Sequence, residues 1–401
     1  MKTVLSINGH RKYAEKLVLF FLLLMCIPTN EAYEFLDPLL RFFRYVGLSV
    51  ALLVFITTRL YKEKKIRAFY FWAIWMLVAS ALNATDLVAF FKMIYPIFAS
   101  VILTQYYVNQ RKEKIITDFA IVFAVLALIN AVVAITGVFG EIYSGGLQGN
   151  YLFGIRVNIS FLLPYALGLN FMNAQIDGRR GIFFLVATVA SLVYFVIFEW
   201  VSTGIVTIGV FLIVYLFLNI FYFNRRFLKT AVLLFVIVCV GFVFFMSKLH
   251  VFEWFLVGVL KEDVTLDNRT LLWEQAFEYL KGLHWLYGFG FKHGYKFTVS
   301  WWFSADHPHN EYLEVLFCYG VIGLAIYVKM IINQVKVTLK MEKSRIQNAV
   351  LTMLLACCLM HAVSHNIMAV YPFITYVIIM NVDKFNKNGQ RKQMRGVDAV
   401  S

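Results

Sequence analysis

Residues 306–324 read DHPHNEYLEVLFCYGVIGL, and this stretch leads into an apolar helix. Asn310 suits the N-cap of that helix, because an asparagine side chain can accept a hydrogen bond from a backbone N–H of the first turn. The apolar residues continue to about Gln334, so the helix is long enough to cross a bilayer. His307 and His309 stand just before it, on either side of a proline. The stretch therefore predicts a membrane helix with titratable side chains at its mouth.

The composition extends this prediction to the whole chain. Of 401 residues, 61% are hydrophobic and 17% aromatic, and apolar runs of membrane-spanning length recur along the sequence. A net charge of +14 would suggest nucleic acid as the partner of a soluble protein, but here the lysines and arginines mark cytoplasmic loops, so no nucleic-acid partner is expected. The five cysteines lie in apolar segments, which indicates neither a disulfide framework nor a zinc site. The chain is predicted to be an all-α polytopic membrane protein.

Twelve spans are predicted, with eleven to thirteen as the realistic range. They cover residues 16–30, 38–58, 68–85, 87–108, 118–139, 157–174, 181–199, 201–222, 228–247, 310–333, 347–365 and 367–382. With the N-terminus in the cytoplasm, the inner segments carry 27 of the 37 lysines and arginines. Cytoplasmic loops are enriched in these residues, so both termini are predicted to be cytoplasmic.

The predicted organisation has four parts: residues 1–247 with helices one to nine, 248–309 as a long extracytoplasmic loop, 310–382 with helices ten to twelve, and 383–401 as a basic cytoplasmic tail. A loop of this length exceeds what a simple connection needs. Within it, residues 268–281 are predicted to form an amphipathic helix that Asn268 caps and Gly282 ends. We expect the loop to pack on the outer mouths of the spans.

Several cations are expected at the outer ends of the spans. Arg44, Lys92 and Arg156 lie within or beside predicted helices, where a cation is costly unless it has a role. One interpretation is a basic crown at the outer leaflet that binds a lipid-linked pyrophosphate. The alternative is that these long side chains reach water from near the helix ends at little cost.

Arg269 is expected in the first turn of the loop helix. An arginine beside the free backbone N–H groups of a helix N-terminus makes an anion site. The alternative is an arginine that pairs with Asp267 or Glu262.

The histidines suggest proton transfer. A helix dipole should keep His309 neutral and able to accept a proton, as a general base must, although a histidine at a helix cap is often structural. Pro308 is expected to hold His307 extended, away from the helix mouth. His361 and His365 share one helix face, which suits either a metal or a packed pair. The sequence contains no Asp-x-Asp, Walker or GxGxxG motif, so a nucleotide-fed reaction has no support.

The run NRTLLWEQAFEYLKGLHWLYGFG, followed by HPHNEYLEVLFCYGVIGL, resembles the signature of the O-antigen polymerase and O-antigen ligase superfamily. That signature is an Arg-x3-Trp helix, a Gly-x-Gly turn, and a His-Asn pair that enters a glycine-containing membrane helix. The matching residues here are Arg269, Trp273, Gly288, Gly290, His309, Asn310, Leu313, Gly320, Gly323 and Leu324. One departure is that residues 199–204 read EWVSTG, where many members have a Ser-Arg pair.

The resemblance implies a C-type membrane glycosyltransferase that takes undecaprenyl-pyrophosphate glycan as donor and acceptor and needs no cofactor or metal. It implies that Arg269 engages the pyrophosphate and that His309 is the catalytic base. Substrate contacts are expected from Arg156, Lys92, Arg44, His307 and Asn310. The implied location is the bacterial plasma membrane, with the site on the extracytoplasmic face and with membrane lipid, a flippase and a chain-length regulator as partners.

Four interpretations of function follow from these observations. We interpret the chain as a polymerase of O-antigen, capsule or exopolysaccharide repeat units. A ligase that transfers glycan to lipid A core or another acceptor shares the same motif. A lipid-linked oligosaccharide flippase could also have twelve spans, but transporters tend to gather charge near the midplane of repeated halves. A scaffold in an assembly complex is a fourth reading.

Overall fold

The chain forms a bundle of helices in a computed structural model. The structure describes residues 15–27, 37–110, 114–138, 152–153, 156–221, 223–242, 269–291, 293–300, 303–364 and 369–382. The helices of the bundle are residues 15–26, α2 Asp37–Thr57, α3 Arg67–Leu82, α4 Leu87–Gln110, α5 Ile115–Thr136, α6 Leu163–Ile176, α7 Gly178–Phe198, α8 Ser202–Ile220, α9 Arg225–Gly241, α13 Glu311–Lys340, α14 Arg345–Val363 and α15 Tyr371–Met380.

Shorter elements join these helices. In the described part of the chain, the 3-10 helices are η2 Leu60–Lys62, η3 Lys64–Ile66 and η4 Arg156–Phe161. Between α9 and α13 lie α11 Arg269–Tyr279, α12 His284–Tyr287 and a two-stranded antiparallel hairpin, β1 Phe297–Ser300 and β2 Phe303–Ala305. The helix α11 lies inside the range predicted for the amphipathic loop helix, and the hairpin was not predicted.

The polytopic membrane architecture is confirmed, and the described part of the chain has fewer candidate spans than the twelve predicted. Each of the twelve predicted segments coincides with a helix, yet in the described part of the chain only 8 helices are long and apolar enough to cross a membrane. The helices that fall short are residues 15–26, α6 with 14 residues, α9 with 17 and α15 with 10. For α6 and α15, the apolar run is longer than the α-helix it contains. Each of these helices has a proline in its first turn, and proline fits there but not in a helix interior, so the helix does not extend further toward the N-terminus.

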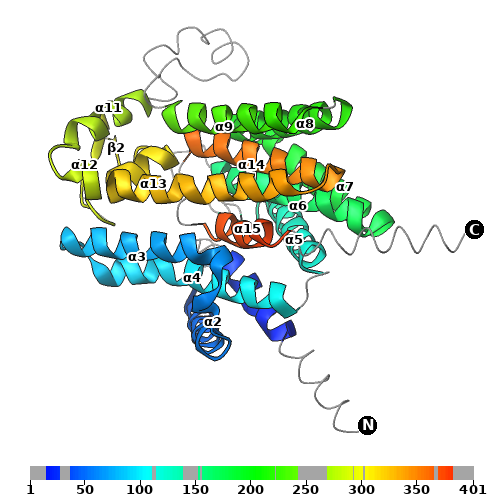
Figure 1. Cartoon of the computed structure of the whole chain (residues 1–401), viewed down its shortest axis with the longest axis horizontal. Helices are drawn as coiled ribbons and strands as arrows, with labels where there is room; N and C mark the ends of the chain where they lie inside the picture. The colour runs from blue at the N-terminus through cyan, green and yellow to red at the C-terminus, as the bar shows by residue number, and fades with distance from the viewer. Residues whose placement is uncertain are drawn as a thin grey trace, which may run out of the picture.

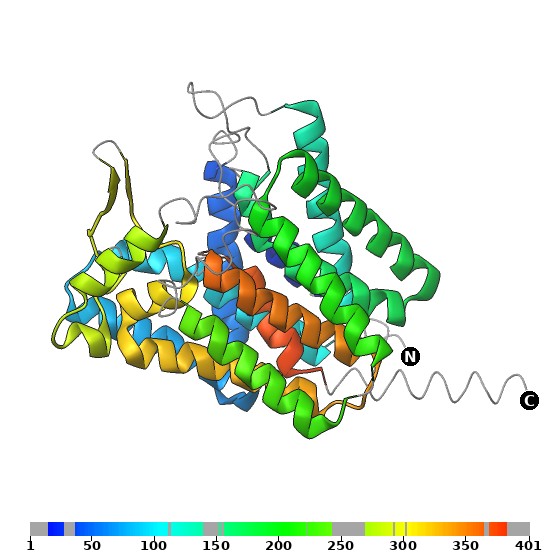
Figure 2. The same cartoon turned by 90° about the horizontal axis from the view of Figure 1, so that it is seen from above.

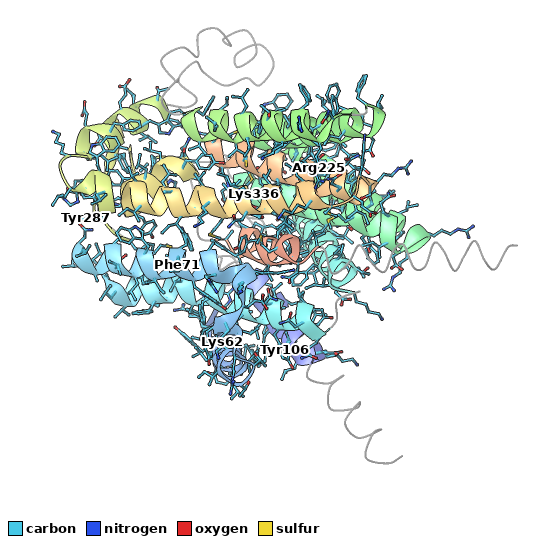
Figure 3. All side chains as sticks on the ribbon, viewed as in Figure 1. Lys62, Phe71, Tyr106, Arg225, Tyr287 and Lys336 are labelled. Carbon is cyan, nitrogen blue, oxygen red and sulfur yellow. The ribbon has the colours of Figure 1, made fainter. Side chains whose placement is uncertain are left out.

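Large apolar side chains cover the outside of the bundle. Phe71 on α3, labelled in Figure 3, is 57% exposed, and Ile213 on α8 is 68% exposed. A soluble monomer rarely exposes apolar surface on this scale, whereas a membrane protein presents it to lipid.

The helices α13 and α14 lie in the middle of the bundle. Figure 1 shows α8 and α9 above them, α3 and α4 below them, and α15 between these layers. The short helices α11 and α12 sit at one end of α13, and Figure 2 shows the hairpin projecting from that same end. We call this the loop end of the bundle. Arg225, where α9 begins, lies toward the opposite end from Tyr287 (Figure 3).

The helix α13 is broken at Gly320, whose φ of 67° and ψ of −174° are not helical. The break frees carbonyl groups of the preceding turn, and the glycine turn after α12 takes them up. The backbone N–H of Phe289 donates to the Phe317 carbonyl at 2.9 Å, and that of Gly290 donates to the Cys318 carbonyl at 2.8 Å. The two glycine motifs of the signature are therefore the two sides of one contact.

This contact leaves no room for side chains. A Cβ at Gly320 would lie 2.2 Å from the Leu286 carbonyl oxygen, and a Cβ at Gly288 would lie 2.3 Å from the carbonyl carbon of Cys318. Both residues also occupy a region with positive φ and extended ψ that is essentially restricted to glycine. The break is thus encoded by glycine on both partners.

Replacing Gly320 with Ala should therefore destabilise the protein strongly. The strained backbone alone costs on the order of 1–3 kcal/mol, and the overlap with Leu286 adds to it. The expected result is a large fall in melting temperature and in monodisperse protein after detergent extraction. Gly209→Ala in α8 is the matched control, because a Cβ there meets nothing within 4 Å. Equal melting temperatures for the two variants would contradict this account.

Candidate functional site

Two separate segments converge on the C-terminal end of α14. The guanidinium of Arg269, at the start of α11, donates to the Val363 carbonyl. The side chain of Asn310 donates to the neighbouring Ala362 carbonyl, and the backbone N–H of Glu311 donates to the Ser364 carbonyl at 3.1 Å. The carbonyl groups at the end of a helix lack partners within it, so they are natural docking points. The loop helix and the mouth of α13 are thereby fixed side by side.

His309 is held between anchored neighbours. Its φ is 52°, in the left-handed region, which histidine enters more readily than most residues but still at a cost. On one side, the indole N–H of Trp273 donates to the Pro308 carbonyl at 2.5 Å. On the other side, the Asn310 side chain accepts from the Leu313 N–H at 2.9 Å, which confirms the N-cap. Two residues of the signature, Trp273 and Asn310, therefore fix the backbone of His309.

His307 does not lie away from the helix mouth, as the sequence had suggested. The left-handed conformation of His309 turns the chain, so the His307 and His309 rings contact each other with centroids 4.2 Å apart. Pro308 restricts the backbone of His307, but the direction of the chain is decided at His309.

The surroundings of the two histidines favour their neutral forms. Burial, with smaller contributions from neighbouring His307 and Arg269, lowers the pKa of His309 from 6.5 to about 3. Burial also lowers the pKa of His307, and the nearby Asp306 carboxylate opposes that shift. Because Arg269 acts on the charge of His309, the structure brings the two residues predicted as catalytic into one electrostatic environment.

The remaining predicted substrate contacts are Arg44, Lys92 and Arg156. Arg44, on α2, donates through Nε to the Leu24 carbonyl at 3.2 Å and also to the Ile27 carbonyl, so it ties down the end of the first helix. Figure 1 shows α2 separated from α11 by α3 and α13. Lys92 is exposed on α4. Arg156 begins η4, and its side chain lies outside what the structure describes.

A buried polar chain next to the site was missed by sequence reasoning. Tyr327 donates through its hydroxyl to a carboxylate oxygen of Glu311 at 3.1 Å. The same hydroxyl lies 3.3 Å from Nδ1 of His361, and Nε2 of His361 lies 3.3 Å from the Tyr165 hydroxyl. His361 is therefore a packed, hydrogen-bonded histidine, and His365 lies outside the described residues. The available signal was the titratable Glu311 and His361 inside apolar helices, since such residues are rare in membranes.

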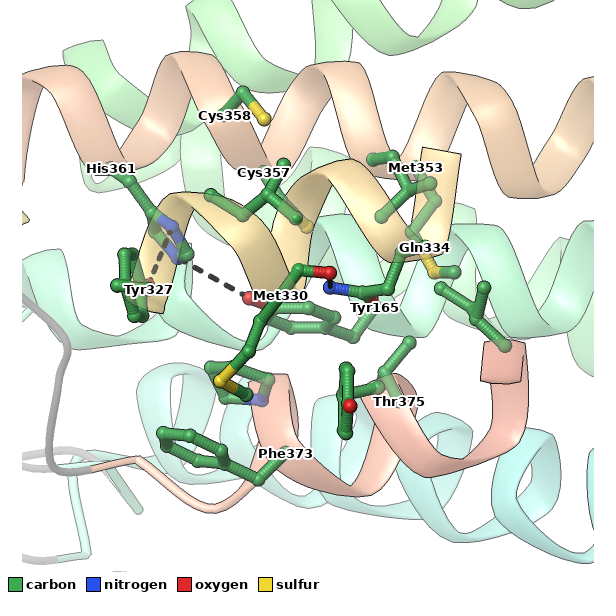
Figure 4. A pocket seen from close by; sticks show the side chains of 15 residues that line it. Tyr165, Tyr327, Met330, Gln334, Met353, Cys357, Cys358, His361, Phe373 and Thr375 are labelled. Carbon is green, nitrogen blue, oxygen red and sulfur yellow. Dashed lines mark hydrogen bonds between the residues drawn. The ribbon is translucent and has the colours of Figure 1, made fainter. Parts of the chain in front are cut away.

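The side chains of this polar chain run along one wall of a cavity between α6, α13, α14 and α15. In Figure 4 the rings of Tyr165, Tyr327 and His361 point toward one another, and Gln334 and Thr375 face the same space. The volume open to the centre of a water-sized sphere is about 40 Å³, enough for ordered water but not for a sugar. The cavity therefore belongs to the support of the site and not to substrate binding.

Among the residues that the structure describes, one group of side chains has the donor atoms of a metal site. Ligand atoms of His293, Glu314 and Cys318 lie within 4.8 Å of one another. The Cys318 thiol already donates to Glu314 at 3.3 Å, and Nδ1 of His293 accepts from the Tyr295 N–H at 3.0 Å. These bonds are those of a polar cluster that packs the turn after α12 onto α13.

The fold and this site together define a polytopic membrane protein with a helix-mouth histidine and a loop arginine fixed at the same end of the bundle. Residues 186–328 match the family model described as O-antigen ligase, so this part of the chain is an O-antigen ligase family domain, and the resemblance found in the sequence is confirmed. The matched range contains every residue of the signature, from Arg269 to Leu324. Comparison with curated proteins gave no match. Enzymes of this family are glycosyltransferases of polysaccharide biosynthesis, and their substrates are lipid-linked glycans.

Proposed function

We propose that this protein polymerises undecaprenyl-pyrophosphate-linked oligosaccharide repeat units at the extracytoplasmic face of the bacterial plasma membrane, as a C-type glycosyltransferase. The observation that supports the proposal is that Arg269 and Asn310, the residue next to His309, both bond to the end of α14, and that Arg269 acts on the charge of His309. Arg269 and His309 both lie inside the family domain. The side of the membrane rests on the lysine and arginine bias of the loops. A flippase that delivers the repeat unit and a chain-length regulator are the proposed partners.

The reaction needs two groups, and this site offers both. A hydroxyl of the acceptor sugar attacks the anomeric carbon of the donor, a C–O bond forms, and the C–O bond to the diphosphate breaks. His309, neutral in the free protein, takes the hydroxyl proton. Arg269 balances the charge that develops on the leaving diphosphate, and its planar fork of N–H groups suits phosphate oxygens. His307, Arg156 and Lys92 are proposed to contact the lipid diphosphate. Asn310 is buried and its side chain bonds the Ala362 carbonyl and the Leu313 N–H, so its proposed role is to hold the helix mouth and not to contact substrate.

A pKa of about 3 makes His309 a weak base in the free protein, and substrate is proposed to correct this. Two causes of the low value are burial and the positive charge of Arg269. A bound diphosphate brings negative charge beside Arg269 and favours the protonated imidazole, so the pKa rises toward neutrality as the donor binds. The base would then be strongest when a reacting hydroxyl is present.

The activity test uses purified protein in lipid nanodiscs with a synthetic lipid-pyrophosphate repeat unit. A ladder of lengthening products supports the polymerase. Transfer only to an added foreign acceptor would make it a ligase, and movement of the lipid across proteoliposomes without new glycosidic bonds would make it a flippase. The same assay in EDTA tests metal use, and we expect unchanged turnover because an arginine can neutralise the diphosphate. Loss of turnover that magnesium or manganese restores would overturn the metal-independent mechanism.

The pH dependence should reflect the shifted histidine. A base with a lowered pKa keeps its active, neutral form to lower pH, so the acid limb of kcat/KM moves in the acid direction. With the pKa of His309 at about 3 in the free protein, kcat/KM should stay nearly constant between pH 6.5 and 5.5, where an ordinary histidine would lose roughly fivefold. Initial rates at low donor concentration across this range test it. An acid limb near 6.5 that disappears in His309→Asn would show that His309 titrates normally.

A further inference from the structure

The bond between Tyr327 and Glu311 joins two parts of the same helix that a straight helix would keep far apart. The residues are 16 positions apart, which corresponds to roughly 24 Å along a regular α-helix. Their side chains nevertheless meet at 3.1 Å, and the Tyr312 and Tyr327 rings contact each other with centroids 6.3 Å apart. The first part of α13 is therefore folded back beside the second across the break at Gly320, an arrangement visible at the loop end in Figure 1.

The folded-back part carries the site. Every residue from Glu311 to Gly320 is buried, and His309 and Asn310 stand directly at its mouth. The angle between the two parts of α13 thus decides where His309 lies. Glycine at the break permits this angle but does not select it, because glycine accepts many backbone conformations.

The rest of the polar chain fixes Tyr327. The single hydroxyl proton of Tyr327 goes to Glu311, so its oxygen must accept the Nδ1 proton of His361. A neutral imidazole then has its lone pair on Nε2, which accepts from the Tyr165 hydroxyl. The hydrogen bonds consequently run in one direction from α6 through α14 to both parts of α13 (Figure 4).

From these observations we infer that Tyr327, Glu311 and His361 are positioning residues for the glycosyl transfer: they clamp the two parts of α13 at the angle that places His309. This inference rests on the function proposed above. Buried polar groups in a bilayer are costly unless they are fully hydrogen-bonded. A clamp across the break in α13 explains why the four hydrogen-bonded side chains occur together in this apolar environment. In the folded protein the clamp holds the base; it does not itself carry the proton.

Tyr327→Phe keeps the buried ring and removes the hydroxyl. We expect kcat to fall about 100-fold, the scale associated with a misplacement of about 1 Å, while KM for the lipid donor changes little. Tyr376→Phe is the matched control, because Tyr376 lines the same cavity and also loses one buried hydroxyl bond, to the Lys65 carbonyl at 3.0 Å. Its kcat should stay within about twofold of the parent.

Glu311→Gln separates positioning from proton transfer. The amide oxygen can still accept from the Tyr327 hydroxyl, so a clamp predicts kcat near the parent value, whereas Glu311→Leu should resemble Tyr327→Phe. A full loss of turnover in Glu311→Gln would overturn the positioning role.

A second measurement does not depend on the proposed reaction. Amide hydrogen exchange in residues 311–319 should accelerate at least tenfold in Tyr327→Phe and not in Tyr376→Phe, because the hinge at Gly320 loses its tie. Unchanged exchange in this segment would overturn the clamp. Faster exchange in a protein whose parent forms no glycosidic bond would support the clamp while refuting the polymerase.

Discussion

His309→Ala should abolish the proposed polymer formation while the protein remains folded and inserted. Loss of a general base lowers the rate by roughly 10²–10⁴-fold, enough to remove long chains from a cell surface. The half-buried ring of His309 contacts His307, and the backbone of this turn is held by Trp273 and Asn310, so folding should survive. The measurements are turnover of the lipid-linked repeat unit and melting temperature of the purified variant.

His309→Asn strengthens this test, because asparagine tolerates the left-handed φ of 52° and cannot act as the base. A loss of activity in both variants assigns the effect to the imidazole and not to the backbone. His307→Ala should cost less, since His307 touches the base without being the group at the helix mouth. Normal long-chain polysaccharide in cells with His309→Asn would remove the base assignment and leave α11 and its neighbours as a binding surface.

Arg269→Lys should lower kcat/KM by roughly 10²–10³-fold, the effect of losing one oriented donor to a developing negative charge. Lysine preserves the charge but presents a point ammonium in place of a planar fork. The loss should include a raised KM for the lipid donor, because the diphosphate is present in both the ground state and the transition state. Initial rates over a range of donor concentrations separate the two constants.

Arg269 also has a structural bond, to the Val363 carbonyl, and Trp273→Phe controls for it. That variant removes the bond from the α11 indole to the Pro308 carbonyl but leaves the arginine in place. If α11 only anchors the turn, both variants should lose kcat at constant KM. A raised donor KM in Arg269→Lys alone would assign Arg269 to the diphosphate, and identical behaviour of the two variants would contradict that role.

Much of the architecture followed from sequence because the bilayer imposes a simple rule. Apolar runs must form helices to satisfy their backbone groups, and all twelve predicted segments do contain one. Helix ends were less predictable. The apolar run at 157–174 begins as the 3-10 turn η4 and becomes the short α6 only at Leu163, since hydropathy does not distinguish these conformations.

The candidate site was also predicted only in part from the sequence. The motif residues Arg269, Trp273 and His309 could be selected from spacing and residue type, and the family match covers all of them. The prediction that Arg44 binds substrate used only its place near a helix end, and the structure gives its guanidinium two backbone carbonyls to bond. A charge at a helix end indicates that a partner exists but not which partner it is.

From the sequence alone it could be predicted that this is a helical membrane protein, that the candidate site lies near residues 269–324, and that several glycines occur in that region. The role of the glycines became visible in the folded chain: Gly288 and Gly320 leave room for two backbones to pack closely, and α13 turns back on itself there. The structure also shows that the Tyr327 hydroxyl lies within hydrogen-bond distance of both Glu311 and His361. The physical reason is that spacing predicts neighbours only within a regular helix. At a break, the direction of the chain is set by partners from distant segments that supply the missing hydrogen bonds.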